Sequence, residues 1–375
     1  MDERSGTVKA RPSQCVGAIA DPEAGPAEIA SHLERVLPEL LGSRIDGPDG
    51  WRIELVHERL PAGEPGTHAT LIDHAASRRD DAGWAAVVCV TDLPLRGEHD
   101  EPLVADLAIG RGVAVVSLPA FGAARLRRRT AQVVTELVAE IVGPVTSSTQ
   151  TGPRRRTSLQ DRDLPGPYRL LNPDADPIDA QIVATRGRWR QLVGMVRSNR
   201  PWRLLLGLRG AVVGAFAFSA FWLVNPSIWQ LGNAHSFARL ALLSLWAITA
   251  IVTWLIVYHR LWERGRDAAP DPEQVALFNA STVITLLIGI SIAFAGLLMI
   301  NLVAAHLAIA PVVAREHLGP DVGFAEYVKL TWMATAGAAL AGSLGSGFDS
   351  EESVREAAYS QRERERRDQW RGAPD

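Results

Sequence analysis

Three polar residues stand at the ends of predicted strands, where a ligand could bind. Asp21 follows an apolar strand, Asp92 follows the run WAAVVCVT, and Ser117 lies near the end of VAVVSL. In open α/β sheets, ligands bind beyond the carboxyl ends of the strands, so these side chains form a candidate ligand-binding site. The alternative is structural, because Asp21 also fits the role of a turn or helix N-cap acid.

Other chemical motifs are missing from the sequence. GxGxxG, GxxxxGK[ST], GxSxG and paired CxxC patterns do not occur, so we assign no catalytic residue and expect no cofactor. His68 and His74 are six residues apart, which places them on different faces of a helix rather than together as metal ligands. The loop 93–102 is charged, and such loops are usually just solvated.

The elements that would position this site alternate along residues 1–143. Continuous or alternating apolar runs predict strands, and apolar residues at helical spacing predict helices between them. This alternation indicates an α/β layer structure with a mostly parallel sheet. The strands are expected at 14–20, 51–57, 84–91, 103–109 and 113–118, and the helices at 27–41, 67–77 and 125–142.

The second half of the chain has a different composition. Residues 210–231, 240–258, 275–314 and 330–348 contain no Asp, Glu, Lys or Arg. Because about 20 apolar residues cross the hydrocarbon core of a bilayer, these runs predict an all-α bundle of about four transmembrane helices. The spans are expected at about 208–229, 238–259, 279–302 and 327–346.

The run 275–314 is open to two interpretations, one long helix or two spans with a turn near Asn301. We favour a single span followed by an amphipathic or protruding stretch that contains His306 and Pro311. Two spans would give five in total and would place the arginine-rich tail outside the cell, against the charge rule.

Charge is distributed unevenly around these spans. Residues 1–145 carry 15 Lys and Arg against 22 Asp and Glu, whereas residues 146–203 carry 11 Arg against 5 Asp. An acidic domain is not typical of a nucleic-acid-binding protein. Basic flanks lie on the cytoplasmic side of a membrane, so an even number of spans with both termini cytoplasmic fits best.

The flanking segments complete the expected organisation. Residues 144–200 are rich in Pro and Arg and predict a linker with a basic juxtamembrane stretch, and 349–375 predict a charged cytosolic tail. Thr157 and Ser158 follow three arginines and resemble a kinase site, although a simple basic patch explains the same residues. No apolar h-region opens the sequence, so no secretory signal is expected. Arginine-rich usage suggests the plasma membrane of a bacterium.

Small and polar residues within the spans suggest how the helices pack. Gly210 and Gly214 form a GxxxG step that favours close helix contact, within one chain or between two copies. The last span carries two small-residue stripes with the same property, namely Ala334, Ala338, Gly342 and Ser346, and Gly337, Ala341 and Gly345. Asn279, Asn301 and His306 are polar, and interhelical hydrogen bonds are their simplest role.

Two families share features with this sequence. The order VTDLPL, PLVADLAIGRGVAVVSLPAFG and RRTAQVVTELVAEIVG is similar to the scaffold of archaemetzincin-type zinc peptidases, which carry H-E-x-x-H on the helix. The matching segment is Thr135–Ala139 with Glu136 at the Glu position, but both zinc-binding histidines are absent. Because zinc needs three or four N, S or O ligands, the resemblance implies at most a non-catalytic relative.

The second resemblance covers roughly residues 185–367. The stretches LVGMVRSNRPWRLLLGLRG, NASTVITL and ALAGSLGSGFDSEESVREAAYSQRERER resemble uncharacterised multi-pass actinobacterial integral membrane proteins. This resemblance implies membrane residence and brings no activity with it.

Three functional hypotheses follow. The leading one is a membrane-anchored binding, regulatory or scaffold protein with a cytosolic α/β domain and the lipid bilayer as partner. The second is a membrane-associated enzyme with a site at Asp21, Asp92 and Ser117. The third is a small-solute or lipid transporter with a polar cavity near Asn279, Asn301 and His306.

Overall fold

The computed structural model describes residues 14–22, 24–45, 50–61, 67–97, 101–143, 159, 167–173, 177–185, 187–204, 208–263 and 272–345. The chain divides between Ser198 and Asn199 into two compact units, an N-terminal α/β unit and a C-terminal helical unit. Each unit is described by itself below.

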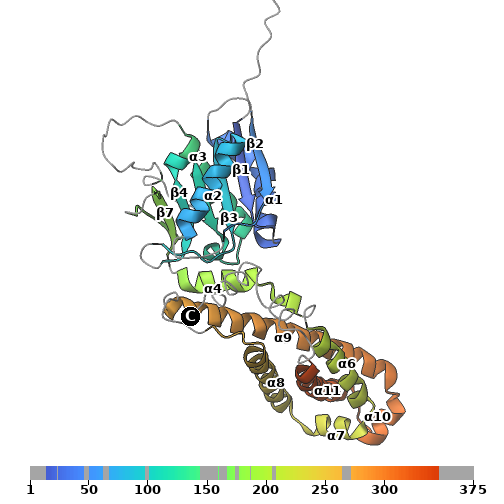
Figure 1. Ribbon diagram of the computed structural model, residues 1–375. Helices are drawn as coiled ribbons and strands as arrows, with labels where there is room; N and C mark the ends of the chain where they lie inside the picture. Colours follow the sequence, from blue (N-terminus) through green and yellow to red (C-terminus); the bar gives the residue numbers. More distant parts are fainter. Residues whose placement is uncertain are drawn as a thin grey trace, which may run out of the picture. The chain divides into compact units, whose positions relative to one another are not determined.

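The α/β unit is built on one seven-stranded sheet with the order β2-β1-β3-β5-β4-β7-β6 (Figure 1). β1, β3 and β5 are neighbours and run parallel, and β2 runs parallel to β1 on its other side. The strands are β1 Gln14–Ala20, β2 Trp51–His57, β3 Ala86–Thr91, β4 Leu103–Ala108, β5 Val113–Ser117, β6 Tyr168–Leu171 and β7 Ala180–Ala184.

The sheet is mixed, and the prediction of a mostly parallel sheet was wrong in this half of it. β4 runs antiparallel to both β5 and β7, and β6 runs antiparallel to β7. Only the 3₁₀ turn Ile109–Arg111 and Gly112 separate β4 from β5. A connection this short can join only antiparallel strands, since a parallel crossover needs a dozen or more residues.

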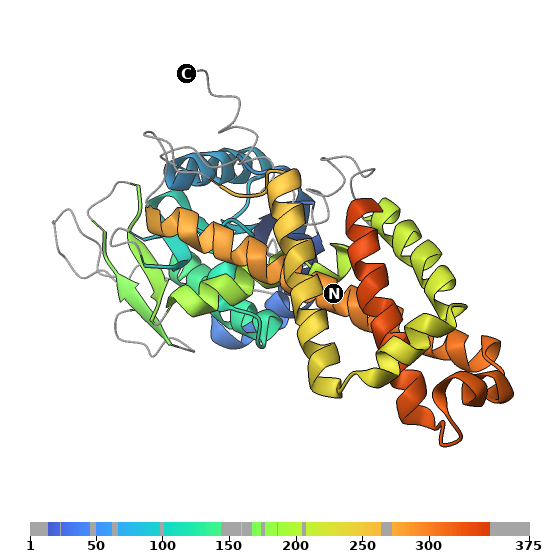
Figure 2. The ribbon, with the colours of Figure 1, turned by 90° about the horizontal axis from the view of Figure 1, so that it is seen from below.

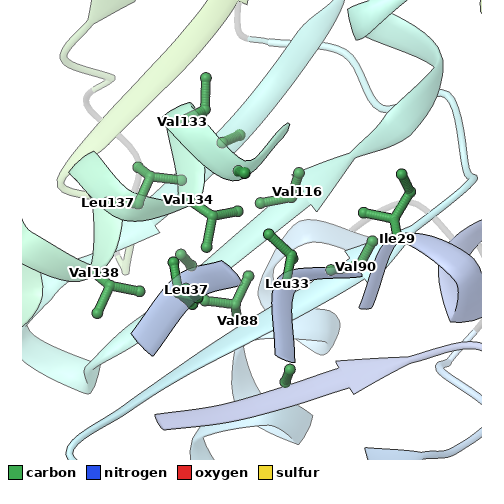
Figure 3. Close-up of a cluster of buried hydrophobic side chains, with 14 of the residues drawn as sticks. Ile29, Leu33, Leu37, Val88, Val90, Val116, Val133, Val134, Leu137 and Val138 are labelled. Carbon is green, nitrogen blue, oxygen red and sulfur yellow. The ribbon is translucent and has the colours of Figure 1, made fainter. Parts of the chain in front are cut away.

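Helices cover both faces of the sheet. α1 (Ala24–Arg44) and α3 (Leu126–Val142) pack on one face, and α2 (Thr67–Ala82) packs on the other. Figure 3 shows side chains of α1 and α3 meeting valines of the sheet, including Leu33 and Val88. Alternate strand residues face the two sides, as expected for a pleated strand, so β1, β3 and β5 are apolar on both.

The segment predicted as a linker contributes part of this unit. β6, β7 and the helix α4 (Gly187–Ser198) all lie within 144–200. β7 has the sequence AQIVA and is fully buried between β4 and β6. α4 runs across one end of the strands and packs against the 3₁₀ turn η2 (Leu118–Phe121), which follows β5 (Figure 1). The predicted kinase site at Thr157 and Ser158 lies outside the described residues, as do 349–375.

The helical unit contains α6 Arg209–Leu223, α7 Pro226–Ala234, α8 Phe237–Tyr258, α9 Pro272–Ala308, α10 Pro311–Leu318 and α11 Phe324–Gly345. Within the described residues, two helices are long and apolar enough to cross a membrane, α8 and the Val275–Ala308 part of α9. A third candidate is the pair α6 and α7, if the two together form one span. The predicted bundle of four spans is therefore not confirmed.

The pair α6 and α7 departs from the straight span expected at 208–229. The two helices meet at a bend of 90°. Pro226 begins α7, and the Asn225 side chain caps it by accepting a hydrogen bond from the Ser227 amide. The indole N–H of Trp229 donates to the Leu223 carbonyl across the bend, at 2.9 Å. A proline at the first helical position and its cap start a new helix here, which the apolar composition alone does not reveal.

The run 275–314 forms one long helix and a short one. α9 continues without a break through Asn301 and His306 to Ala308, and Pro311 begins α10. At 1.5 Å per residue a helix of 37 residues is about 55 Å long, which exceeds the hydrocarbon thickness of about 30 Å.

The small-residue stripes of α11 pack within the chain. α11 lies alongside α6, as Figure 2 shows. A side chain added at Gly342 would meet the Ala211 carbonyl, and one added at Gly337 would overlap the Trp222 ring. These two glycines therefore allow close intrachain packing.

We predict that Gly17→Ala destabilises the α/β unit although alanine suits a strand better than glycine. A Cβ at position 17 would overlap the ring of Trp84, which is buried and donates to Glu54 at 3.2 Å. Such overpacking costs about 1–3 kcal/mol. The control Gly42→Ala lies in α1 with nothing within 4 Å and should not destabilise. Thermal unfolding of both variants checks this, and equal melting temperatures would contradict it.

Candidate functional site

The structure places the three sequence-predicted residues at the carboxyl ends of three neighbouring strands. Asp21 follows β1, Asp92 follows β3, and Ser117 ends β5, and these strands are adjacent and parallel. β2 follows β1 in the sequence and lies on one side of it in the sheet, whereas β3, which follows α2, lies on the other side. The strand order therefore changes direction beside β1, and ligands bind at such a point in open α/β sheets.

Asp21 and Ser117 make structural hydrogen bonds at these strand ends. The Asp21 carboxylate accepts a hydrogen bond from the Leu60 amide at 3.3 Å. The Ser117 hydroxyl donates to the Leu93 carbonyl at 2.6 Å and accepts from the Leu95 amide at 3.4 Å. All three predicted site residues are buried. Ser117 therefore holds the start of the loop that follows β3, and its hydroxyl is already committed to the backbone.

A second polar group lies on the α2 face of the sheet. Nδ1 of His68, in the first turn of α2, is 2.5 Å from Oδ2 of Asp106 in β4. The amide of Gln181 in β7 donates to Oδ1 of the same carboxylate at 2.8 Å. Asp106 is fully buried, whereas the His68 side chain is 26% exposed. An ionised carboxylate only accepts, so Nδ1 of His68 carries the proton in this pair.

The Asp106 carboxylate changes the proton affinity of His68. Burial is the largest single effect and lowers the pKa of the imidazole, but the hydrogen bond and the negative charge of Asp106 together outweigh it. The pKa of His68 is therefore raised above its ordinary value of 6.5. A carboxylate that orients one ring nitrogen is also found beside general-base histidines.

Sequence reasoning missed this pair. His68 and Asp106 are 38 residues apart and come from different elements. One signal was available, since Asp106 interrupts the otherwise apolar strand LVADLA, where an acid must find a partner. The partner itself could not be found from spacing.

A third polar cluster surrounds η2, and we call it the η2 cluster. It consists of Arg129 of α3, Tyr168 of β6, and Arg190 and Gln191 of α4. The Tyr168 ring packs edge-on against Phe121, with ring centroids 5.8 Å apart, and the Arg190 guanidinium lies 5.9 Å from the Tyr168 ring centroid. Arg129 donates to the Phe121 carbonyl at 3.4 Å. Two arginines thus converge on the same short turn.

Polar residues of the helical unit are paired with protein groups. Asn279 accepts from the Glu263 amide at 2.8 Å and donates to its carbonyl at 2.9 Å. Asn301 donates to Ser219 at 3.1 Å and to Thr335 at 2.9 Å, which joins α9 to α6 and α11. His306 is exposed, and its Nδ1 lies 2.9 Å from the Leu302 carbonyl of its own helix. The two asparagines therefore make internal hydrogen bonds rather than line a polar path.

Among the described residues, no three His, Cys, Asp or Glu side chains are grouped so that they could hold a metal ion. No protein-family model matches the chain, and neither the curated proteins nor the solved structures that were compared with it gave a match.

We predict that Asp106→Asn removes a pH-dependent part of the stability. Because the pKa of His68 is raised in the folded state, its contribution is fully present below about pH 6.5, the unfolded value, and is lost as pH rises through the folded pKa. The variant should be less stable by about 1–3 kcal/mol at pH 6, with the difference shrinking at higher pH.

Melting temperatures measured from pH 5.5 to 9 check this prediction. The control Glu136→Gln removes an acid that pairs with an arginine, Arg44, instead of a histidine. It leaves the His68–Asp106 pair intact and should keep the wild-type slope. An Asp106→Asn protein with that same slope would contradict the assignment.

Proposed function

We propose that this chain is a multi-pass protein of a bacterial plasma membrane that holds an α/β binding or regulatory domain at the cytoplasmic face. The observation that supports it is the apolar surface of α8 and α9. Leu242, Leu245 and Trp246 are each at least 60% exposed in the middle of α8. Met299, Val303 and Leu307 are exposed apolar side chains on α9.

Water is a poor solvent for such a surface. Soluble monomers rarely expose contiguous apolar patches of more than a few hundred Å². A surrounding lipid bilayer removes the free-energy cost of exposing such a surface to water. Trp254, Tyr258 and Trp262 gather toward the end of α8, with the first two rings stacked 5.1 Å apart. Tryptophan and tyrosine favour the interface between lipid and water, so this end of α8 is placed at a membrane surface.

The orientation follows from charge. No acidic residue occurs from Ala180 to Trp262, and arginines flank the first predicted span and the α8–α9 connection. The positive-inside rule then places the sheet domain and the α8–α9 connection in the cytoplasm. The resemblance of 185–367 to multi-pass actinobacterial membrane proteins supports the same proposal. We assign a binding or scaffold role because Ser117 and the membrane asparagines are occupied by internal hydrogen bonds.

One observation favours a second candidate, a membrane-associated enzyme. The His68–Asp106 pair is a ready general base in the α/β unit, although it is not the strand-end site expected from the sequence. Hydrolysis of p-nitrophenyl acetate by the full chain and by Asp106→Asn tests it. Equal rates would remove this candidate.

We predict that the full chain stays in the membrane pellet after alkaline carbonate extraction. We also predict that Leu245→Arg lowers the amount of inserted protein, because arginine near the centre of a span costs about 2.5–3.5 kcal/mol in insertion. On a water-facing surface the same change would cost within about 0.5 kcal/mol. The control Ser77→Arg is on an exposed position of α2 and should leave insertion unchanged. Release of the wild-type chain by carbonate would refute membrane residence.

We predict that a cysteine at Ser236 reacts with a membrane-impermeant maleimide on intact cells, since the proposed topology places the α7–α8 connection outside. Trp262→Cys, in the α8–α9 connection, should react only after permeabilisation. Both positions are exposed, so accessibility alone does not distinguish them. Labelling in the opposite order would invert the topology.

A further inference from the structure

The η2 cluster contains buried polar atoms that have no hydrogen-bond partner among the described residues. Nη1 of Arg190, the Tyr168 hydroxyl and both amide atoms of Gln191 are buried without a hydrogen-bond partner in the described part of the chain. Gln191 is only 1% exposed. A buried polar group without a partner costs about 1–3 kcal/mol, so four such atoms on neighbouring residues need an explanation.

Packing around η2 brings these groups toward one place. A Cβ at Gly194 would overlap Pro119 at the start of η2, and one at Gly122 would meet the Arg190 side chain at the other end. Gln191 lies between these contacts and shares a helical face with Gly194. The side of α4 that carries Gln191 therefore faces η2.

Arg129 and Arg190 bring positive charge to the η2 cluster. Neither Arg129 nor Arg190 forms an ion pair with an acidic side chain of the described residues, whereas Arg127 of the same helix pairs with Glu28. The first turn of α3 contains Arg127, Arg128 and Arg129 and no acidic residue. Cations at a helix N-terminus oppose the helix dipole, and a bound anion would offset this cost.

The two arginines act on the Tyr168 hydroxyl. Burial raises the pKa of Tyr168, and the positive charges of Arg190 and Arg129 partly offset that effect. The hydroxyl therefore stays protonated near neutral pH and can donate a hydrogen bond to an anion held by the guanidinium groups.

We propose that Arg129, Tyr168, Arg190 and Gln191 form a binding site for a phosphate-type oxyanion. Arginine donors arranged as a planar fork match phosphate oxygens, and the hydroxyl and amide supply neutral donors from other directions. Donors arriving from α3, β6 and α4 suit a tetrahedral group with several acceptor oxygens better than a planar carboxylate. The phosphate is either a free ion or the headgroup of an anionic lipid.

This site deepens the proposed binding role of the α/β unit and rests on that proposal. Membrane residence is tested separately by carbonate extraction, so a failed phosphate experiment and a failed membrane experiment are distinguishable.

The test uses the full chain in a non-ionic detergent. Melting temperature is measured against inorganic phosphate, with sodium chloride at equal ionic strength as the baseline, and a dissociation constant is taken from the concentration dependence. The double variant Arg129→Gln, Arg190→Gln should weaken phosphate binding by about tenfold or more. The matched control is Arg128→Gln, Arg188→Gln, which removes the same charge from exposed positions of the same two helices. It should bind as the wild type does.

Gln191→Leu separates a ligand role from a structural one. Because leucine needs no hydrogen-bond partner, this variant should melt at the same or a higher temperature without phosphate and should respond less to phosphate. A lower melting temperature together with an unchanged phosphate response would overturn the assignment. Tyr168→Phe keeps the ring contacts and should also weaken the response.

A lipid arm identifies the source of the phosphate. Micelles are doped with phosphatidic acid or with phosphatidylcholine at equal mole fraction. Stabilisation by phosphatidic acid alone, lost in Arg129→Gln, Arg190→Gln, supports a lipid headgroup, and stabilisation by inorganic phosphate supports a free ion. No stabilisation by either probe, or equal loss in the control pair, would overturn the proposal.

Discussion

Burial of β1, β3 and β5 on both faces is the constraint on which the rest of the α/β unit depends. When three parallel strands are apolar on both faces, polar side chains can lie in only two places. One is the end of a strand, and the other is a position with a buried partner. Asp21, Asp92 and Ser117 take the first place, at the carboxyl ends of the strands. Asp106 takes the second, where His68 and Gln181 occupy both of its oxygens.

In the helical unit the positions of apolar and polar side chains are reversed. Large apolar side chains lie on the outside of α8 and α9, and polar side chains lie inside with partners. Asn301 links three helices through two hydroxyl groups, and the Trp332 indole donates to the Ser244 hydroxyl at 2.6 Å. Hydrogen bonds of this kind join helices where the hydrophobic effect does not drive association. Asn279 and Asn301, two of the three residues named for a transport path, thus make internal hydrogen bonds.

The two polar groups of the α/β unit differ in a way that matters for function. Asp106 is satisfied in the folded chain, so the His68–Asp106 pair is complete by itself and its main effect is on protonation and stability. The η2 cluster is incomplete within the described part of the chain, because buried polar atoms of Tyr168, Arg190 and Gln191 have no hydrogen-bond partner there. A complete network contributes to the fold, whereas buried polar atoms without partners require an explanation, and the proposed oxyanion supplies one.

Sequence alone determined the features that depend on local composition. The helices α1, α2 and α3, the strands β1 to β5 and the apolar stretches of α8 and α9 were predicted close to their observed places, because periodicity and run length are properties of neighbouring residues. The position of Asp21 and Asp92 at strand ends followed in the same way.

Tertiary structure decided everything that depends on which segments pair. β4 runs antiparallel because a short turn joins it to β5, and β7 enters the sheet from a stretch whose composition resembled a linker. The bend at Asn225 depends on a cap and on an indole hydrogen bond across it. His68 contacts Asp106, and Arg129 lies near Tyr168 and Arg190. These residues are far apart in the sequence, so the periodicity of the sequence does not predict their contacts. Spacing fixes which face a residue occupies, and only packing fixes what lies opposite it.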